Sequence, residues 1–328
     1  MPGIRRMQPE DLGQVNIVFT KAFSHARMEE GLKQHRVSPC RPEFLRMYLD
    51  RSGEGAMVAI EREQVVGFNF SHLYGATGWM GPLAVLPKYQ GVGVGKAVVR
   101  GGIEYLRRRS ANVIGLETMP RNFRNIGFYL GLGFNPGPLC LDMVSQAHSG
   151  GTPTHIDGVE IASFRGSGSA DRKNLLRGCN EVAGALSPGL DYAGEILLNM
   201  EHGFGDTVLL MDDGVVAGLA ICHLEPYGQF EERRELKVSA LAMRPESGAM
   251  EPSEKALAKL SMLLAGVKDL AARERLSAVR LHVRSDKWGA LSGLLSWGYT
   301  IGYSDLRMCL GGFGEEEPPH HIHFCRWQ

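Results

Sequence analysis

The sequence predicts an α/β protein of the α+β kind, in which two similar tandem domains each hold a mixed central sheet flanked by helices. Three observations lead to this fold class. The chain has 328 residues, and a domain holds about 150 residues on average. Short segments of the first half recur in the same order in the second half. Within each half, strand-like and helical runs alternate in the order typical of an α/β domain with a partly parallel sheet.

The internal repeat consists of two strand-like segments and one turn. Their order is kept while the spacing between them changes, as expected for a duplicated domain whose loops have changed length. Two copies are too few for a solenoid, so the repeat indicates two globular domains. The recurring pairs are VVGFNFSHL (65–73) with VAGLAICHL (216–224), PLAVLP (82–87) with ALAMRP (240–245), and GLGF (131–134) with SWGY (296–299).

The elements of the first half follow from the hydrophobic pattern. Apolar residues at helical spacing predict helices over residues 43–49 and 96–109. Runs rich in β-branched and aromatic residues predict strands over residues 56–60, 65–71 and 113–117.

The domain boundary is expected in SQAHSGGTPTHIDG, residues 145–158, where Ser, Gly, Thr and Pro interrupt the apolar pattern. We expect a first domain over residues 1–148 and a second over residues 155–313. The remaining residues, 314–328, are acidic and proline-rich before HHIHF. They form a predicted tail outside the second core.

Composition and charge narrow the class of function. Lys plus Arg and Asp plus Glu number 36 each, so the chain lacks the basic footprint of a nucleic-acid or membrane-surface protein. No apolar stretch approaches the ~20 residues that span a bilayer, and the start of the chain lacks a signal-peptide core. The six cysteines show no paired spacing and are expected to be reduced, mostly buried thiols. We therefore expect a cytoplasmic monomer or homodimer that binds neither nucleic acid nor membrane.

A glycine-rich turn in LAVLPKYQGVGVGKAVV, residues 83–99, carries the clearest chemical signal. Gly91, Gly93 and Gly95 leave backbone N–H groups unobstructed at the start of a helix, where the helix dipole favours an anion such as a diphosphate. A Walker P-loop is excluded, because Lys96 is followed by Ala97 in place of Ser or Thr. A dinucleotide-binding fingerprint fits poorly, because Lys96 stands where its third glycine is required.

Two segments together resemble the GNAT superfamily of acyl-CoA-dependent N-acetyltransferases. Gln90, Gly93 and Gly95 match the family's pyrophosphate loop, Q/R-x-x-G-x-G/A. NFRNIGFYLGLGF, residues 122–134, matches a later signature in which an Asn is followed seven residues on by a Tyr and then by a Gly-Phe pair. The resemblance covers nearly all of residues 1–144 and, more weakly, the second half, so it implies two tandem GNAT-like domains.

The resemblance implies acetyl-CoA as co-substrate, with no metal, and a small-molecule primary amine as acceptor. The backbone of residues 83–85 is expected to bind the pantetheine arm, the N–H of Val85 to face the thioester carbonyl, and residues 90–96 to hold the pyrophosphate. Tyr129 is the implied general acid for the leaving thiolate. The implied cofactor-binding residues are Leu83, Ala84, Val85, Gln90, Gly91, Val92, Gly93, Val94, Gly95, Lys96, Asn122, Phe128 and Tyr129.

The general base stays unassigned by the sequence. An alkylamine with a pKa of about 10.4 arrives protonated at neutral pH, yet the strand over residues 79–85 lacks the Glu or Asp that many family members carry there. Glu117 and His72 are the two candidates. Glu117 can also be interpreted as a solvated carboxylate at the end of a strand. His72 can be interpreted as structural, because His223 repeats it in the second half.

The second half departs from the family pattern where the cofactor would bind. Its counterpart of the glycine-rich turn, PESGAMEPSEK (245–255), has Gly248 as its only glycine and would repel a pyrophosphate through Glu246, Glu251 and Glu254. Lys287 stands in place of Asn122, and Leu294 in place of Tyr129. We therefore expect catalysis in the first domain only, with the second completing the substrate pocket or bracing the first.

Two other functions fit the same residues. A non-catalytic acyl-CoA-binding or sensor protein would need the turn but not Tyr129, which favours the enzyme. An O-acyltransferase would use the same site on a hydroxyl. The histidines at 320, 321 and 323 with Cys325 resemble a metal-binding cluster, but a tail offers no surrounding groups to orient such ligands, so no metal is predicted.

Overall fold

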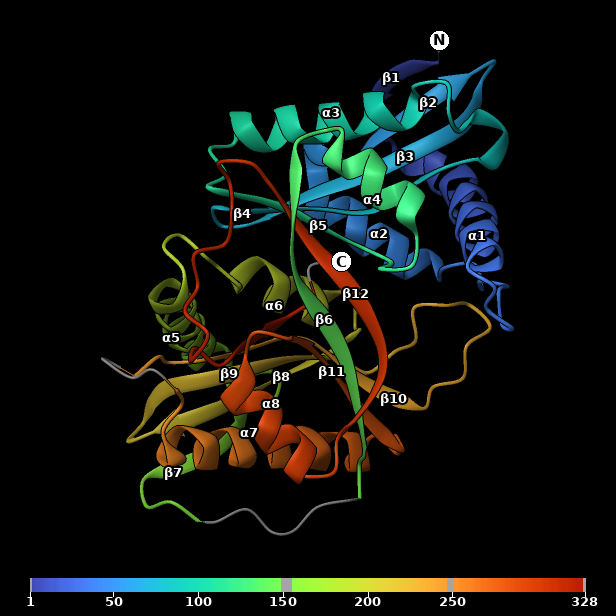
Figure 1. Cartoon of the computed structure of the whole chain (residues 1–328). Coiled ribbons are helices and arrows are strands. Elements are labelled where there is room, and N and C mark those ends of the chain that lie inside the picture. The colour runs from blue at the N-terminus through green and yellow to red at the C-terminus, as the bar shows by residue number, and fades with distance from the viewer. Residues whose placement is uncertain (1, 149–154, 247–250, 327–328) are drawn as a thin grey trace.

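The computed structural model describes residues 2–148, 155–246 and 251–326. Each half contains the same elements in the same order, which confirms the repeat (Figure 1). The first half comprises β1 (Gly3–Arg6), α1 (Leu12–Glu29), α2 (Pro42–Ser52), β2 (Met57–Glu61), β3 (Gln64–Tyr74), β4 (Thr77–Val85), α3 (Val94–Arg108), β5 (Val113–Thr118), α4 (Phe123–Leu130) and β6 (Phe134–Gln146). The second comprises β7 (Val159–Ser163), α5 (Ser169–Leu186), α6 (Ala193–Glu201), β8 (Gly205–Asp212), β9 (Val215–His223), β10 (Glu235–Met243), α7 (Glu254–Arg273), β11 (Ala278–Arg284), α8 (Trp288–Ser296) and β12 (Thr300–Leu310), followed by β13 (His323–Cys325).

The strands form one mixed sheet that runs through both halves in the order β1-β2-β3-β4-β5-β12-β6-β11-β10-β9-β8-β7. Neighbours from β1 to β4 pair antiparallel, whereas β4 pairs parallel with β5, and β10 with β11 in the same way. The predicted partly parallel sheet flanked by helices is confirmed.

The strands that end the two repeats, β6 and β12, pair with strands of the opposite half of the chain. β12 pairs with β5 and β6, and β6 pairs with β11 and β12. The β6–β12 ladder runs from Phe134 opposite Leu310 to Val144 opposite Thr300, and these two strands cross the centre of the molecule side by side (Figure 1). The residues expected to form the first domain therefore supply a strand to the part of the sheet that the second half forms. Of the predicted linker, residues 149–154 lie outside the described residues.

The C-terminal tail is part of the second core, so its predicted position outside that core is wrong. β13 pairs antiparallel with β10, placing Leu241 opposite Phe324 and Ala242 opposite His323. Phe324 is 2% exposed. The alternation of apolar side chains at Ile322 and Phe324 is the strand signal, and the acidic residues before it hid that signal.

Strands β4 and β5 pair only along part of their length. The parallel ladder joins residues 77–80 to residues 113–116 and then stops, so residues 83–85 pair with β3 but not with β5. In the second half β10 and β11 separate in the same way after Lys237, but there β13 fills the gap. An open strand edge thus exists in the first half and is closed in the second.

The cysteines have the predicted state, free and mostly buried. All six cysteines are free thiols, five of them buried and Cys309 half-buried. In the part of the chain that the structure describes, no helix has the length and apolar character needed to cross a membrane.

Candidate functional site

A cavity of about 370 Å³ lies beside the open edge of β4 and is bordered by α1, the start of α3 and α4. It gathers most of the residues predicted to bind a cofactor, which are Leu83, Ala84, Val85, Gln90, Gly91, Gly93, Gly95, Lys96, Asn122, Phe128 and Tyr129. Residues of α1, among them Phe23 and His25, complete the wall. Sequence reasoning missed this contribution, because α1 lies far ahead of the motifs in the chain and carries no motif of its own.

Two of the predicted residues do not line this cavity. The side chain of Val92 is 62% exposed, and Val94 is 3% exposed in a small apolar cluster with Val98. Helix α3 begins at Val94, two residues before the predicted start. If Val92 and Val94 contact a ligand here, they do so through backbone atoms.

The turn before α3 has the geometry of an anion cradle. Gly93 adopts φ +95° and Gly91 adopts φ +80°, and nothing lies within 4 Å of where a Cβ would stand at either position. The first N–H groups of α3 have no intrahelical partners, because such partners begin four residues into a helix. They coincide with the positive end of the helix dipole, and Lys96 adds a cation to the same wall. A phosphate or diphosphate fits this cradle.

The open edge of β4 provides backbone groups for an extended ligand. The N–H of Leu86 donates to Val66 on β3, so the alternation of a strand directs the N–H groups of Leu83 and Val85 to the opposite side, toward the cavity. The Gln90 Nε2 donates to the Val85 carbonyl at 2.9 Å and ties the turn to the strand. An amide-containing chain can add to this edge as a further strand would.

Tyr129 stands where the first cavity meets a second one of about 430 Å³. Both cavities are lined by Phe23, Leu83, Met119, Asn125 and Tyr129. Tyr129 is 5% exposed. Burial raises the pKa of its phenol above the ordinary value, so the hydroxyl is protonated across the physiological range and can act as a proton donor.

The wall of the second cavity opposite Tyr129 comes from the second half of the chain. The apolar residues of this cavity come from α1, α2 and β4, whereas the second half supplies mostly charged and phenolic groups. These second-half residues include Tyr227, Lys237, Arg280, Tyr303, Asp305 and Arg326.

Glu117 is a buried ion-pair partner, so its interpretation as a solvated carboxylate is wrong. Its side chain is 0% exposed. One oxygen accepts from Arg307 Nε at 3.0 Å and Nη2 at 2.6 Å, and the other accepts from His282 Nε2 at 3.1 Å. Burial alone would raise the pKa of Glu117, but the charges of His282 and Arg307 outweigh it and hold the pKa well below its usual range. A carboxylate held so acidic is a poor proton acceptor near neutral pH.

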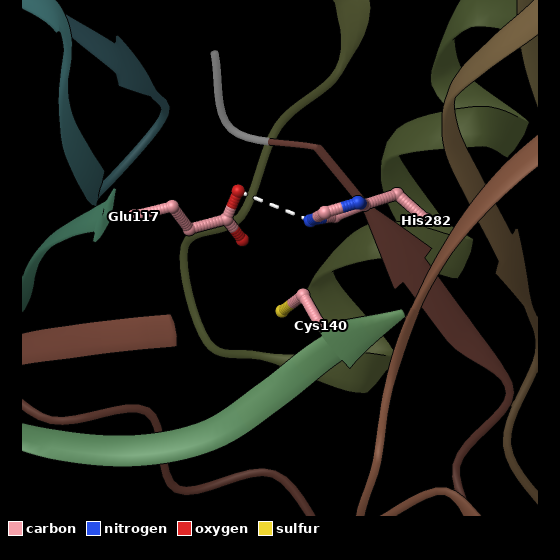
Figure 2. Close-up of side chains that lie close together, drawn as sticks. All are labelled: Glu117, Cys140 and His282. Atoms are coloured by element: carbon pink, nitrogen blue, oxygen red, sulfur yellow. Dashed lines mark hydrogen bonds and ion pairs between the residues drawn. The ribbon is translucent and has the colours of Figure 1, made fainter. Parts of the chain in front are cut away.

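Glu117, His282 and the thiol of Cys140 come within 4.8 Å of one another, a spacing at which three ligands can hold a metal (Figure 2). Two cations already occupy this cluster, however. His282 also bonds Asp142 through Nδ1 at 2.7 Å, and its pKa is raised well above normal, because the charge of Glu117 outweighs burial. A protonated imidazole and a guanidinium supply the positive charge that a metal would otherwise bring, so we interpret the cluster as an ion-pair network.

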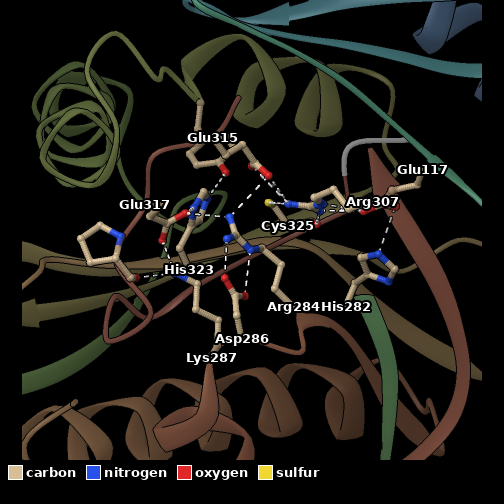
Figure 3. Close-up of polar contacts among 12 residues, drawn as sticks. Glu117, His282, Arg284, Asp286, Lys287, Arg307, Glu315, Glu317, His323 and Cys325 are labelled. Atoms are coloured by element: carbon tan, nitrogen blue, oxygen red, sulfur yellow. Dashed lines mark hydrogen bonds and ion pairs between the residues drawn. The ribbon is translucent and has the colours of Figure 1, made fainter. Parts of the chain in front are cut away.

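The network continues from Glu117 through Arg307 into the C-terminal tail (Figure 3). Arg307 is 0% exposed and donates to Glu315 and to the carbonyl of Cys325. Lys287 is also 0% exposed and donates to Glu317 and to the Pro318 carbonyl, each at 2.8 Å. Glu315 and Glu317 of the tail are therefore counter-ions for cations buried in the second half.

His72 lies away from both cavities. It is 0% exposed and packs edge-on against Tyr48 and Tyr74. His223, its counterpart in the repeat, is likewise buried and contacts the hydroxyl of Tyr227 at 3.0 Å. Both placements agree with the structural interpretation of these histidines.

The counterpart of the first cavity is smaller in the second half, a space of about 170 Å³ beside Met243, Glu246 and the start of α7. The carboxylate of Glu246 accepts from the hydroxyl of Ser253 at 2.7 Å and from its N–H at 3.1 Å, at the start of α7. The protein thus places its own anion where the first half has its cradle. Lys287 precedes α8 as Asn122 precedes α4, and it holds the tail whose strand covers the edge of β10. Gly248, in the same turn, lies outside the described residues.

Asp305, on β12, is a candidate base to which the sequence did not point. It lines the second cavity together with Tyr129. Its carboxylate lies 3.9 Å from Arg326 and has no hydrogen bond within the described ranges. Burial and the negative charge of Glu117 raise the pKa of Asp305 to about 7. No pattern in the sequence links this position to the first domain, because the link is made by the exchange of β12.

A sheet whose parallel strands separate beside a glycine-rich helix start is the arrangement of a GNAT domain, and the comparisons with known proteins agree. Residues 21–134 match the model of the acetyltransferase (GNAT) family. Within the first half, residues 21–134 are therefore similar to a GNAT acetyltransferase domain.

One curated relative and two solved structures extend the comparison. Over 88 residues the chain is 35% identical to a mycothiol acetyltransferase of Stackebrandtia nassauensis, a match covering 25% of this chain and 28% of that protein. A putative acetyltransferase from Pyrococcus horikoshii superposes with a TM-score of 0.66 at 16% identity, covering 99% of this chain and 94% of the other. A tandem GNAT protein from the clavulanic acid biosynthesis pathway superposes with a TM-score of 0.61 at 14% identity, covering 96% and 100%. The whole chain thus has the tandem GNAT fold.

Proposed function

We propose that the protein is an N-acetyltransferase that transfers the acetyl group of acetyl-CoA directly to a primary amine, with catalysis in the first half. The observation that carries this proposal is the junction of the two cavities at Leu83 and Tyr129. One cavity fits a phosphorylated, amide-containing donor, and the other offers a separate space for an acceptor. A sensor that only bound acyl-CoA would need the first cavity alone.

The donor is expected to bind along the first cavity. Its diphosphate would lie on the turn at Gly91, Gly93 and Gly95, and its pantetheine amides along the open edge of β4. The thioester carbonyl would then face the N–H of Val85, which can stabilise the oxyanion that forms on attack.

The acceptor is expected to enter through the second cavity. Its nitrogen would attack the thioester carbon from the side of Asn125 and Met119, where the two cavities are continuous. Breakdown of the tetrahedral intermediate would expel a thiolate, to which Tyr129 donates its proton. The second half would act by supplying the far wall of the acceptor cavity.

The test has two parts. Calorimetric titration with acetyl-CoA and with CoA measures binding, and release of free thiol in the presence of amino sugars, polyamines, amino acids and peptides measures transfer. We expect binding of both nucleotides and amine-dependent thiol release. Binding without thiol release for any amine would favour the sensor, and release dependent on an alcohol would favour O-acylation.

A further inference from the structure

The proposed reaction requires a group that removes a proton from the acceptor amine. Strand β4 carries no acidic residue, and Glu117, on the neighbouring strand, is held by Arg307 and His282. His72 does not reach either cavity. The two candidates that the sequence offered, Glu117 and His72, therefore leave the reaction without a base.

The exchange of strands brings Asp305 to the wall of the acceptor cavity. β12 lies directly beside β5, pairing Leu306 with Thr118, and Asp305 is the residue before that pair. Both Asp305 and Thr118 line the acceptor cavity, as do Leu83 and Tyr129. The Asp305 side chain is 8% exposed, so it is largely desolvated yet borders the space that an acceptor would fill.

Charged and titratable groups from every neighbouring element act on Asp305. The anions are Glu117 on β5 and Asp142 on β6, and the cations are His282 on β11 and Arg326 next to β13. Tyr303, on β12 itself, lines the same cavity. Arg326 is shared, since its Nη2 lies 3.1 Å from Asp142 and 3.9 Å from Asp305. Burial and the anions outweigh the cations, so the pKa of the Asp305 carboxyl is raised above that of an ordinary aspartate.

We propose that Asp305 is the general base that deprotonates the acceptor amine, an inference that rests on the proposed function. The ammonium proton passes to an oxygen of Asp305, and the freed nitrogen lone pair forms the C–N bond. The C–S bond then breaks, Tyr129 gives its proton to the sulfur and regains one from the nitrogen, and Asp305 releases its proton to water. The sum is one amide, one thiol and one proton, so the step balances.

The C-terminal strand has a positioning role in this scheme. β13 inserts beside β10 and ends at Cys325, and the next residue, Arg326, reaches Asp142. Arg326 is thereby fixed beside Asp305 by the same strand that covers the edge of β10. The degenerate half thus contributes both the base and the cation that orients it.

The experiment compares the full-length protein with Asp305→Asn and Asp305→Glu. The probe is acetyl-CoA with the best amine of the panel, and kcat/KM is measured by thiol release from pH 5.5 to 9. We expect the wild type to lose activity below a pKa near 7. Asp305→Asn should be slower by about 10²- to 10⁴-fold and should lack that limb, whereas Asp305→Glu should keep a limb and part of the rate.

Two further measurements make the result decisive. The affinity for acetyl-CoA should stay within about twofold of the wild type in both variants, because Asp305 does not line the first cavity, and thermal melting reports folding. A folded Asp305→Asn with the wild-type rate and pH limb overturns the base while leaving the proposed function intact. A wild type that binds acetyl-CoA and acetylates no amine overturns both.

Discussion

Gly93 combines a left-handed backbone conformation with open space in the turn before α3, where the proposed diphosphate would lie. Its φ of +95° favours glycine, and no atom lies within 4 Å of where a Cβ would stand. Gly93→Asp would place a carboxylate where the anion has to approach, so we expect acetyl-CoA affinity to fall by more than about 100-fold, since repulsion adds to the loss of the cradle. Calorimetric titration measures the change.

The matched control is Gly203→Asp. Gly203 also has a positive φ, +68°, with open space around it, and it lines neither cavity. Both variants carry the same backbone strain, about 1–2 kcal/mol, so their melting temperatures should fall alike. Equal acetyl-CoA affinities in the two variants would remove the turn from the site.

Tyr129 is placed to donate a proton and little else. Its ring packs between Phe128 and Phe134, contacts that a phenylalanine would keep. Tyr129→Phe should therefore lower kcat by about 10²- to 10⁴-fold, leaving acetyl-CoA affinity and the melting temperature nearly unchanged. Steady-state thiol release compares the two enzymes. If the variant turns over at the wild-type rate, a water or another side chain protonates the sulfur.

Ion pairs hold the C-terminal tail against the second half of the protein. Glu317 contacts Lys287 and His323, each at 2.8 Å. Burial would raise the pKa of Glu317, but its contacts with His323 and Lys287 outweigh burial and lower the pKa to about 2. Because the pKa of Glu317 is lower in the folded than in the unfolded protein, its ionised carboxylate stabilises the fold at pH values above the unfolded pKa of about 4.3. This stabilisation is lost as the pH falls toward 2. The difference in the free energy of unfolding is on the order of 3 kcal/mol.

Glu317→Gln should accordingly destabilise the protein at pH 7 by about 3–5 kcal/mol, because it leaves Lys287 buried without a counter-ion. The loss of stability between pH 4.5 and pH 2 should also become smaller. Guanidinium denaturation at several pH values measures both effects. Glu316→Gln, at an exposed neighbouring position with no ion pair among the described residues, is the control, and an equal effect in both variants would contradict the role of Glu317.

Elements with a local signature could be predicted from the sequence, and elements defined by distant pairing could not. The glycine-rich turn and the strand repeat depend on neighbours in the chain, and the structure has them where expected. β13 follows an acidic segment and gains its identity only from β10. Asp305 becomes part of a site only because β12 pairs with β5 of the first half. No local pattern in the sequence specifies this pairing.

For the whole molecule, the exchange of β6 and β12 makes the halves interdependent. A fragment of residues 1–148 would lack β12 and leave the edges of β5 and β6 unpaired, and such open edges lead to aggregation. We expect this fragment to be insoluble or inactive when produced alone. Co-expression with residues 155–328 should restore solubility and acetyl-CoA binding, as measured by gel filtration and calorimetry. A soluble fragment that acetylates at the full-length rate would refute this interdependence.

The difference between the two halves at the cofactor cleft predicts how many donor molecules one chain binds. In the first half the edge of β4 and the start of α3 are open. In the second half β13 pairs with β10, and Glu246 contacts Ser253 at the start of α7. The space left there is about 170 Å³, less than half that of the first cavity, and the carboxylates of Asp212 and Glu246 line it. Titration with acetyl-CoA should therefore give one site per chain. In the Gly93→Asp chain the binding heat should disappear and not fall to half, because we expect the second half to bind no donor. Two sites in the wild type, or a residual site in the variant, would mean that the tail yields to the cofactor and that the second half is a working donor site.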